Sequence, residues 1–408
     1  MRRIWILNHY AVTPASAGGT RHFSLASNLN RLGWRCTIIA SDTNHVSGLD
    51  EFPEIEHPHL TDYEDVEFLW LKTAEYHGNG FARVRGMFQY FFSVLKKHTT
   101  NKLERPDVVV GSSVHPLAAL AGAILAKRYR VPFVYEIRDL WPETLIQMGS
   151  IKRKSLPAII LRRLERYLVS RAELVVSLLP HISTYFETHH MSPRKTLWLS
   201  NGVDLESFPF TEANDTGGAP LSIVYFGAHG QANGLDVVIN ALKLFKDANG
   251  ADLIKMRFIG EGPGKNKLIE RAEALGLTEF DISFEPQVLK AEIPAIAAEA
   301  DAFIISVLDL PELYKYGISM NKLFDYLAAA RPVLIASSAP NNPVDEANCG
   351  YSSPAQDAET LAINLRLLSE STAEQRKNMG RAGRDHLIEN YTFEKLSKRL
   401  SDELDILI

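Results

Sequence analysis

The chain has 408 residues, too many for one hydrophobic core, and at about 150 residues per domain its length predicts two or three domains. Hydrophobic residues make up 46% and charged residues 23%, which is typical of globular enzymes and excludes disordered, collagen-like and coiled-coil chains. No apolar run reaches the roughly 18 residues that a membrane span needs, and the start MRRIWILNHY reads as a strand rather than a signal peptide. Two distant cysteines, Cys36 and Cys349, exclude a disulfide framework and suit a reducing cytoplasm.

The charge is distributed unevenly along the chain. Residues 1–200 hold 25 lysines and arginines against 18 acidic residues, whereas the rest holds 19 against 31. The segment 81–171 alone carries 17 basic and 6 acidic residues. Either this reflects ordinary solvated helix faces, or it predicts an anionic partner for the N-terminal half.

Short apolar runs alternate with amphipathic segments, which is typical of βαβ units and a parallel sheet buried on both faces. In the first half the predicted strands are 4–7, 37–41, 107–113, 132–139 and 173–179. A segment rich in Pro, Gly, Asn and Asp, 209–220, is the predicted linker, and the alternation then restarts with 221–227, 254–262, 282–286, 302–307 and 332–337. We therefore predict an α/β fold of two Rossmann-like doubly wound domains that face a central cleft, with the ligand at the carboxyl ends of the strands.

The segment 315–337, KYGISMNKLFDYLAAARPVLIAS, carries the clearest binding pattern. Gly317 permits an unusual backbone conformation, and Ser319 is predicted to cap a helix that begins at Met320. Lys322 and Asp325 would then share one face of that helix. The alternative is a plain connection between a helix and a strand. The binding interpretation assigns a diphosphate to the first-turn amides, and these belong to Ile318, Ser319, Met320, Asn321 and Lys322.

Two glycine-rich turns follow predicted strands. Gly18 and Gly19 would allow a ligand to approach the backbone closely, and Arg21 is a candidate phosphate ligand. Gly227 and Gly230, in FGAHGQANG, have the same potential without a neighbouring Lys or Arg. Each could also be only a tight turn.

Several polar residues follow strands that should end at the cleft. Arg138 and Asp139 lie at the carboxyl end of the predicted strand that contains Glu136, and a buried Arg–Asp pair that holds the loop is the alternative to a ligand site. His115 follows another strand, and His9 follows the first. With Lys322, the residues Arg138, Asp139 and His115 are the candidate catalytic residues, although a lone histidine is often structural.

Two segments, 81–98 and 150–171, combine helical apolar spacing with clusters of lysine and arginine. Such helices lie readily on anionic membranes, and the alternative is a core helix with a basic outer face. Nucleic acid is not an expected partner, because no binding motif accompanies the charge.

Taken together, these motifs resemble the retaining glycosyltransferases of family 4, which have the GT-B fold of two Rossmann-like domains. The similarity runs over essentially the whole chain, and the bacterial N-acetyl-fucosamine transferase branch is the most similar. The motifs that carry it are GGTRH at 18–22, RDLWP at 138–142, SNGVD at 200–204, the loop 226–234 and YGISMNKLFDY at 316–326.

The resemblance implies an N-terminal acceptor-binding domain of residues 1–205 with a returning C-terminal helix 390–408, and a nucleotide-sugar-binding domain of 206–389. It places Asp325 on the ribose hydroxyls. The family's first glutamate falls on Gly317, and its usual Arg and Lys in the Gly-rich loop fall on Ala228 and Asn233. Lys322, with Arg21 across the cleft, is expected to supply the missing charge.

The implied activity is transfer of a sugar, such as an N-acetylated deoxy-aminosugar, from a UDP-sugar to a polyprenyl-diphosphate-linked glycan in O-antigen or capsule synthesis. The protein would be cytoplasmic and peripheral on the inner face of the plasma membrane, with the basic N-terminal domain on anionic lipid. No cofactor and no metal are expected. Two alternatives remain open: a sugar-nucleotide 2-epimerase, and a catalytically weak GT-B scaffold suggested by Gly317.

Overall fold

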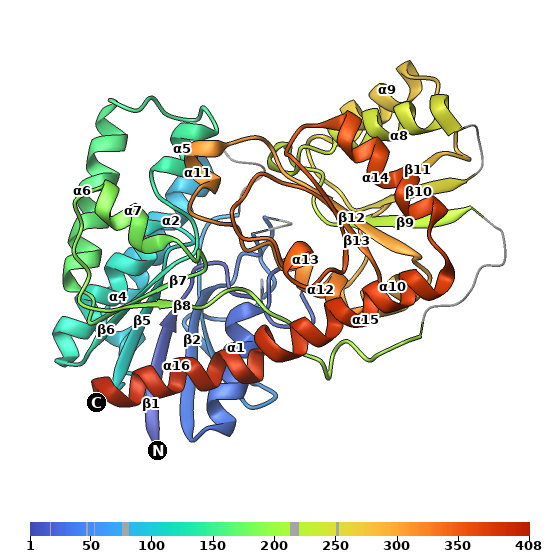
Figure 1. The fold of residues 1–408 in the computed structure, drawn as a ribbon. Coiled ribbons are helices and arrows are strands. Elements are labelled where there is room, and N and C mark those ends of the chain that lie inside the picture. Colours follow the sequence, from blue (N-terminus) through green and yellow to red (C-terminus); the bar gives the residue numbers. More distant parts are fainter. Residues whose placement is uncertain (17, 46–47, 53, 76–80, 213–219, 250–252) are drawn as a thin grey trace. The chain divides into compact units, whose positions relative to one another are not determined.

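The computed structural model describes residues 1–408 except 17, 46–47, 53, 76–80, 213–219 and 250–252 (Figure 1). The chain divides into two compact units. The N-terminal unit comprises Met1–Asn201 together with Phe393–Ile408, and the C-terminal unit comprises Gly202–Thr392. The C-terminal segment, residues 393–408, therefore belongs to the N-terminal unit.

The N-terminal unit is built on an eight-stranded sheet in the order β3-β4-β2-β1-β5-β6-β7-β8. Every neighbouring pair is parallel except β3 and β4, which form an antiparallel pair. The strands are β1 (Arg2–Leu7), β2 (Trp34–Ser41), β3 (His59–Tyr63), β4 (Val66–Leu71), β5 (Val108–Ser112), β6 (Phe133–Ile137), β7 (Leu174–Ser177) and β8 (Thr196–Trp198).

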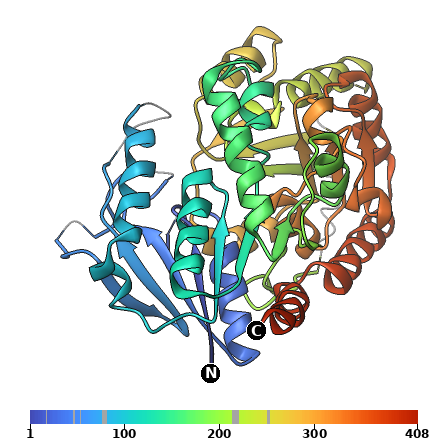
Figure 2. The ribbon, with the colours of Figure 1, turned by 90° about the vertical axis from the view of Figure 1, so that its left-hand side faces the viewer.

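Helices bury both faces of this sheet, which explains why the central strands are apolar throughout. Ile4 and Ile6 share a core with α1 and α16, while Trp5 meets Tyr129 of α4 edge to face at 5.0 Å. Figure 2 shows α2, α4 and α6 lying side by side, with α4 in contact with both neighbours. The helices are α1 (Arg21–Arg31), α2 (Phe81–Leu95), α3 (Lys97–Thr100), α4 (Pro116–Tyr129), α5 (Glu143–Gln147), α6 (Leu156–Arg171), α7 (Ile182–Thr188) and α16 (Phe393–Leu407).

The final helix, α16, is integrated into the N-terminal core. Leu396, Leu400 and Leu404 recur at helical spacing and are buried against α1. Ser401 accepts a hydrogen bond from the indole N–H of Trp34 at 2.9 Å. Because α16 supplies one wall of the core, the unit is incomplete without it.

The C-terminal unit holds a six-stranded parallel sheet in the order β11-β10-β9-β12-β13-β14. Its strands are β9 (Leu221–Phe226), β10 (Ile254–Ile259), β11 (Ile282–Glu285), β12 (Ala302–Ser306), β13 (Val333–Ala336) and β14 (Gly350–Ser353). Two short 3-10 helices are η1 (Gln231–Asn233) and η2 (Lys290–Glu292). The α-helices are α8 (Asp236–Asn249), α9 (Lys265–Ala274), α10 (Ile293–Ala298), α11 (Pro311–Tyr314), α12 (Asn321–Ala328), α13 (Pro343–Glu346), α14 (Ala358–Glu370) and α15 (Ala373–Asn390).

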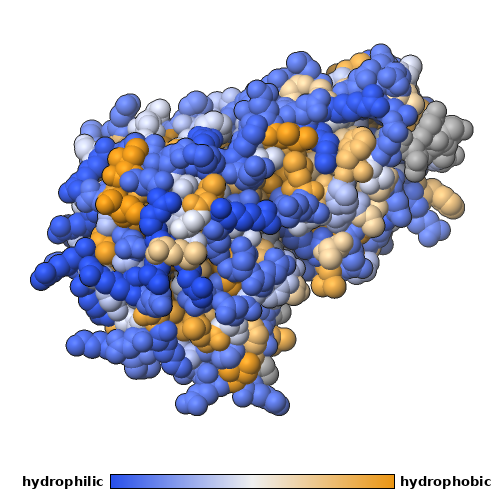
Figure 3. All heavy atoms as spheres, turned by 90° about the horizontal axis from the view of Figure 1, so that it is seen from below, coloured by the Kyte–Doolittle hydropathy of each residue, from blue (hydrophilic) through white to orange (hydrophobic). Residues whose placement is uncertain are grey.

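The predicted α/β fold class is confirmed, and each predicted apolar run coincides with a strand of one of the two sheets. The strands β3, β4, β8 and β14 were not predicted. Of these, β3 is an edge strand whose residues are partly or fully exposed and lack a continuous apolar run. The predicted linker 209–220 lies largely outside the described residues. No helix in the described part of the chain is long and apolar enough to cross a bilayer. On the face shown in Figure 3, hydrophobic residues form separate groups within a mostly hydrophilic surface.

Candidate functional site

The turn before α12 has the unusual backbone that the sequence predicted at Gly317, with φ of +103°. The predicted cap at Ser319 is wrong: Met320 occupies the N-cap position, and no side chain caps the helix. Among the predicted amide donors, the Ile318 N–H is not free for a ligand, because it donates to Oδ1 of Asn341 at 2.8 Å. The side-chain amide of Asn341 in turn donates to the Ile318 carbonyl at 2.8 Å. The first turn of α12 itself begins one residue later than predicted.

Lys322, in the first turn of α12, extends its side chain to the Gly-rich loop that follows β9. Its ammonium donates to the hydroxyl of Tyr225 at 2.7 Å and to Oδ1 of Asn233 at 2.7 Å. Both partners also donate to the Ala228 carbonyl, each at 2.8 Å. A Cβ on Gly227 would lie 3.2 Å from Cε of Lys322, so glycine leaves room for the lysine to pass. We call the closed set of hydrogen bonds among Lys322, Tyr225, Asn233 and Ala228 the lysine ring.

The lysine ring is fixed from two sides. One turn beyond Lys322, the Tyr326 hydroxyl accepts a hydrogen bond from the Phe226 backbone amide at 3.1 Å. The aromatic ring of Tyr326 stacks on that of Phe303, with 4.4 Å between the ring centroids. At the other side, the Ser306 hydroxyl donates to the Asn233 carbonyl at 2.6 Å. These contacts dock α12 and the Gly-rich loop on the carboxyl ends of β9 and β12.

Burial changes the proton affinities at this site. It lowers the pKa of Lys322 to about 7, and it raises the pKa of Asp325 to about 6, against the opposing effect of Lys290. In the described part of the chain, Lys322 forms no ion pair with a carboxylate. Its charge is therefore supported by neutral acceptors only, an arrangement suited to an anionic ligand.

His229 lies in the same Gly-rich loop and was not singled out from the sequence. It is 1% exposed, and neither ring nitrogen has a hydrogen-bond partner among the described residues. Its ring packs near Tyr225 and Phe258, with centroid distances of 5.9 and 6.2 Å. At the neighbouring Gly230, a Cβ would meet only the Asn233 amide at 3.9 Å, so packing does not demand that glycine.

In the N-terminal unit, Arg21 is not free to bind a phosphate as the sequence predicted. Its guanidinium is buried and donates to Glu136 at 3.0 Å, to the Leu199 carbonyl at 2.9 Å and to the Ser200 carbonyl. His22 completes the cluster, with Nε2 2.6 Å from the second oxygen of Glu136. The expected phosphate ligand is therefore engaged inside its own unit, where it ties α1 to β6 and to the segment after β8.

The charges in this cluster are matched. Burial alone would raise the pKa of Glu136, but His22 and Arg21 hold it well below its usual value. Burial lowers the pKa of His22, which favours a neutral imidazole that donates to Glu136 and accepts from the Asn8 amide at 2.7 Å.

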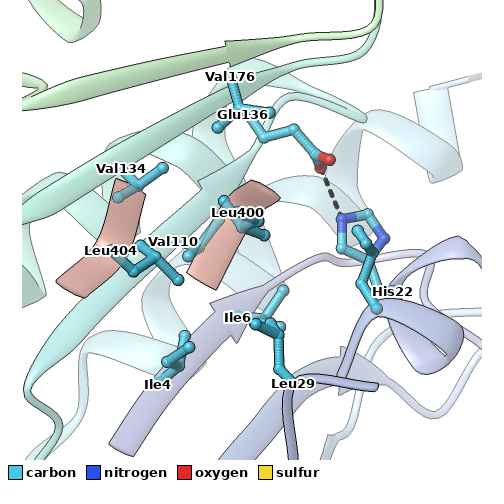
Figure 4. Close-up of a pocket in the computed structure, with 11 residues that line it drawn as sticks. Ile4, Ile6, His22, Leu29, Val110, Val134, Glu136, Val176, Leu400 and Leu404 are labelled. Carbon is cyan, nitrogen blue, oxygen red and sulfur yellow. Dashed lines mark hydrogen bonds and ion pairs between the residues drawn. The ribbon is translucent and has the colours of Figure 1, made fainter. Parts of the chain in front are cut away.

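A cavity of about 20 Å³ borders this cluster (Figure 4). In the close-up, His22 and Glu136 lie at its edge, joined by their hydrogen bond. Its volume is far below the roughly 300–1,000 Å³ of ligand pockets, so it is a packing void beneath α1 and α16. The apolar residues that line it are Ile4, Ile6, Leu25, Leu29, Val110, Val134, Val176, Leu400 and Leu404.

His115 is fully buried, contrary to the expectation that it faces an open site. As N-cap of α4, its Nδ1 accepts from the Ala118 amide at 3.3 Å, and its Nε2 lies 2.7 Å from Nδ1 of His9. Burial, and to a lesser extent Arg83, lowers the pKa of His115 to about 3. A neutral His115 that donates to His9 satisfies both contacts, so this pair is a capping and packing element.

Arg138 and Asp139 follow β6, as predicted. Arg138 is half-buried and its backbone N–H donates to the Ser113 hydroxyl at 3.1 Å, whereas Asp139 is exposed. The alternative of a buried Arg–Asp pair is thus not observed.

The pKa of the nearby His45 is lowered to about 4, mainly by burial and to a lesser extent by the positive charge of Arg138. Gly18 is required here, since its Cβ would lie 2.8 Å from the His45 ring.

Metal-binding arrangements of His, Cys, Asp and Glu are absent from the described residues. Residues 17–202 match the family model of the glycosyl transferase 4-like domain, and residues 211–386 match that of glycosyl transferases group 1. Among curated proteins, the probable glycosyltransferase WbjE of Pseudomonas aeruginosa is 23% identical over 406 residues, covering 96% of this chain and 95% of that protein.

Solved structures with the same fold extend over the whole chain. Sucrose-phosphate synthase from Thermosynechococcus elongatus has a TM-score of 0.76 at 14% identity, and covers 100% of this chain and 99% of its own. HepE of Anabaena, solved with UDP and glucose, has a TM-score of 0.69 at 15% identity, with both chains covered completely.

Proposed function

The chain is a nucleotide-sugar-dependent glycosyltransferase of the GT-B fold, and we propose that it is a retaining enzyme that uses a UDP-sugar donor. The donor diphosphate would bind to the C-terminal unit, at the lysine ring and the first turn of α12. The complex of HepE with UDP and glucose supports UDP as the nucleotide proposed for this chain.

The observation that carries this proposal is the position of the Lys322 ammonium. The resemblance places a family lysine at Asn233 and an arginine at Ala228, and this chain has neither. Instead, α12 brings Lys322 to the same loop, 2.7 Å from Oδ1 of Asn233. A cation beside the first-turn amides suits a departing diphosphate, whose developing charge it would stabilise.

In the proposed mechanism, the acceptor attacks on the face that the nucleotide diphosphate leaves, and a leaving-group oxygen takes the acceptor's proton. The protein positions the reactants and stabilises charge, with no protein nucleophile. Asp325 would hold the ribose hydroxyls. Gly317, which replaces a family glutamate, leaves the sugar to be recognised by other groups.

We further propose a polyprenyl-diphosphate-linked glycan as acceptor, used in O-antigen or capsule synthesis on the inner face of the plasma membrane. The transferred sugar would be an N-acetylated deoxy-aminosugar such as N-acetyl-fucosamine. Exposed apolar residues on α2 and α6 support contact with lipid, because both helices also carry arginines. These apolar residues are Val84, Phe88, Phe92, Leu156, Ile159, Ile160 and Tyr167.

The test combines calorimetry with product analysis on the full chain. UDP-, GDP- and dTDP-sugars are titrated first, and the bound donor is then incubated with and without a lipid-linked acceptor. We expect UDP-sugar binding and product formation only with acceptor. Conversion of the donor alone would indicate an epimerase, and absence of any nucleotide-sugar binding would indicate a scaffold.

A further inference from the structure

The lysine ring gives two further residues a specific task in the proposed donor site. We propose that Tyr225 and Asn233 are positioning residues that orient the Lys322 ammonium towards the diphosphate of the donor. This inference rests on the proposed function, because it assumes that the diphosphate binds at the first turn of α12. It concerns residues on β9 and η1, far from Lys322 in the sequence.

Geometry limits where the ammonium can point. Two of its three N–H bonds are directed to Tyr225 and Asn233, both at 2.7 Å, which leaves one hydrogen for a ligand. The Tyr225 hydroxyl has a single proton, which it donates to Ala228 at 2.8 Å, so it can only accept from Lys322. The ring of Tyr225 also lies 4.5 Å from the ammonium, a cation–π contact.

The partners are themselves rigid. Tyr225 is fully buried, and burial raises the pKa of its hydroxyl far above neutral pH, so it remains a neutral acceptor. Asn233 is held by the bond from Ser306 to its carbonyl, and its amide orientation is fixed by donation to Ala228 at 2.8 Å. A lysine side chain that would otherwise sample many rotamers is therefore held in one direction before the ligand arrives.

The charge environment gives this arrangement a measurable signature. The groups that face Lys322 from the Gly-rich loop and β9 are Tyr225, Asn233 and His229, and the carboxyl group of Asp325 lies one turn along its own helix. Burial holds the pKa of Lys322 at about 7 without ligand. An anionic diphosphate would raise that pKa, so binding should take up about half a proton at pH 7 and nearly one at pH 8.

UDP-glucose is the probe, because its diphosphate does not titrate near neutral pH. Binding to the full chain is measured by calorimetry between pH 6 and 8.5 in buffers of different ionisation enthalpy. Tyr225→Phe keeps the ring but removes one acceptor, and we expect about 10-fold weaker binding at pH 8 with a smaller loss at pH 6. Asn233→Asp places a carboxylate beside the ammonium, which keeps Lys322 charged and should flatten the pH dependence.

A second measurement needs no nucleotide. Reactivity of Lys322 towards an acylating reagent, followed by mass spectrometry against pH, reports its titration in each variant. We expect its midpoint to fall in Tyr225→Phe and to rise in Asn233→Asp, while Tyr351→Phe, a control in β14, leaves it unchanged.

The outcomes separate the two proposals. If the unmodified protein binds UDP-glucose but both substitutions leave the Lys322 titration and the pH dependence of binding unchanged, the positioning role is refuted alone. If the unmodified protein binds neither UDP nor UDP-glucose at any pH, the proposed donor is wrong, and this role for the lysine ring falls with it.

Discussion

Removal of the Glu136 carboxylate should strongly destabilise the N-terminal unit. Glu136→Gln keeps the shape but leaves the buried Arg21 guanidinium without a counter-charge. At 3.0 Å and an effective dielectric constant of 20, the attraction between Arg21 and Glu136 is about 5.5 kcal/mol. Because breaking one side of a buried pair typically costs about 3–5 kcal/mol, we expect a loss of that size in the free energy of unfolding.

Tryptophan fluorescence makes this measurement specific to the N-terminal unit. The chain has five tryptophans, and all of them, Trp5, Trp34, Trp70, Trp141 and Trp198, lie before residue 202. With a urea dependence of about 2–3 kcal/mol per molar, the expected loss moves the unfolding midpoint by roughly 1–2.5 M.

The matched control is Glu173→Gln, which breaks an exposed ion pair with Arg194 in the same unit. Such surface pairs contribute about 0–1 kcal/mol, so its midpoint should barely move. Combining Glu136→Gln with Arg21→Met should cost about 1–3 kcal/mol less than the sum of the single changes. The reasoning is refuted if Glu136→Gln destabilises the unit no more than Glu173→Gln does.

Three other predictions concern the site, the surface and a buried carboxyl. Lys322→Ala should lower turnover on the order of 100-fold without unfolding, measured by product formation and far-ultraviolet circular dichroism, and near-normal turnover would exclude the assigned role. The pair Phe88→Ser and Phe92→Ser should reduce sedimentation with anionic vesicles at low salt, whereas Phe280→Ser, at a more exposed phenylalanine in the C-terminal unit, should not. Equal effects would contradict the proposed lipid surface. Burial raises the pKa of Glu165 to about 8, so the folded state binds a proton that the unfolded chain releases, and stability from this group is lost as pH rises from about 4.5 to 8. Glu165→Gln should therefore gain stability relative to the unmodified protein over that range in urea unfolding, and a constant difference between pH 5.5 and 8 would refute the assignment.

Most of the central strands were predictable because burial on both faces leaves an unbroken apolar run in the sequence. Lys322 and its helix were also found, since a Gly turn followed by a first-turn lysine is a local pattern. Its partners Tyr225 and Asn233 were not, because they lie 97 and 89 residues away and are ordinary strand and loop residues. Only the packing of α12 on β9 brings them together.

Arg21 illustrates the opposite error. An arginine after a Gly-Gly turn can bind a phosphate or form a buried ion pair, and the local sequence is the same in both cases. The distinction depends on Glu136, Leu199 and Ser200, which are between 115 and 179 residues distant. The same contacts bring residues of GGTRH, of the strand before RDLWP and of SNGVD into one hydrogen-bonded cluster.

The integration of α16 into the N-terminal core has a consequence for biosynthesis. The first unit lacks one wall until the ribosome has translated the leucines near residue 400, whereas residues 202–392 of the second unit are contiguous and emerge earlier. During translation, the unit encoded first should therefore be the last to reach its final packing. Until then, the apolar surface of α1 that α16 later covers would be open to chaperones.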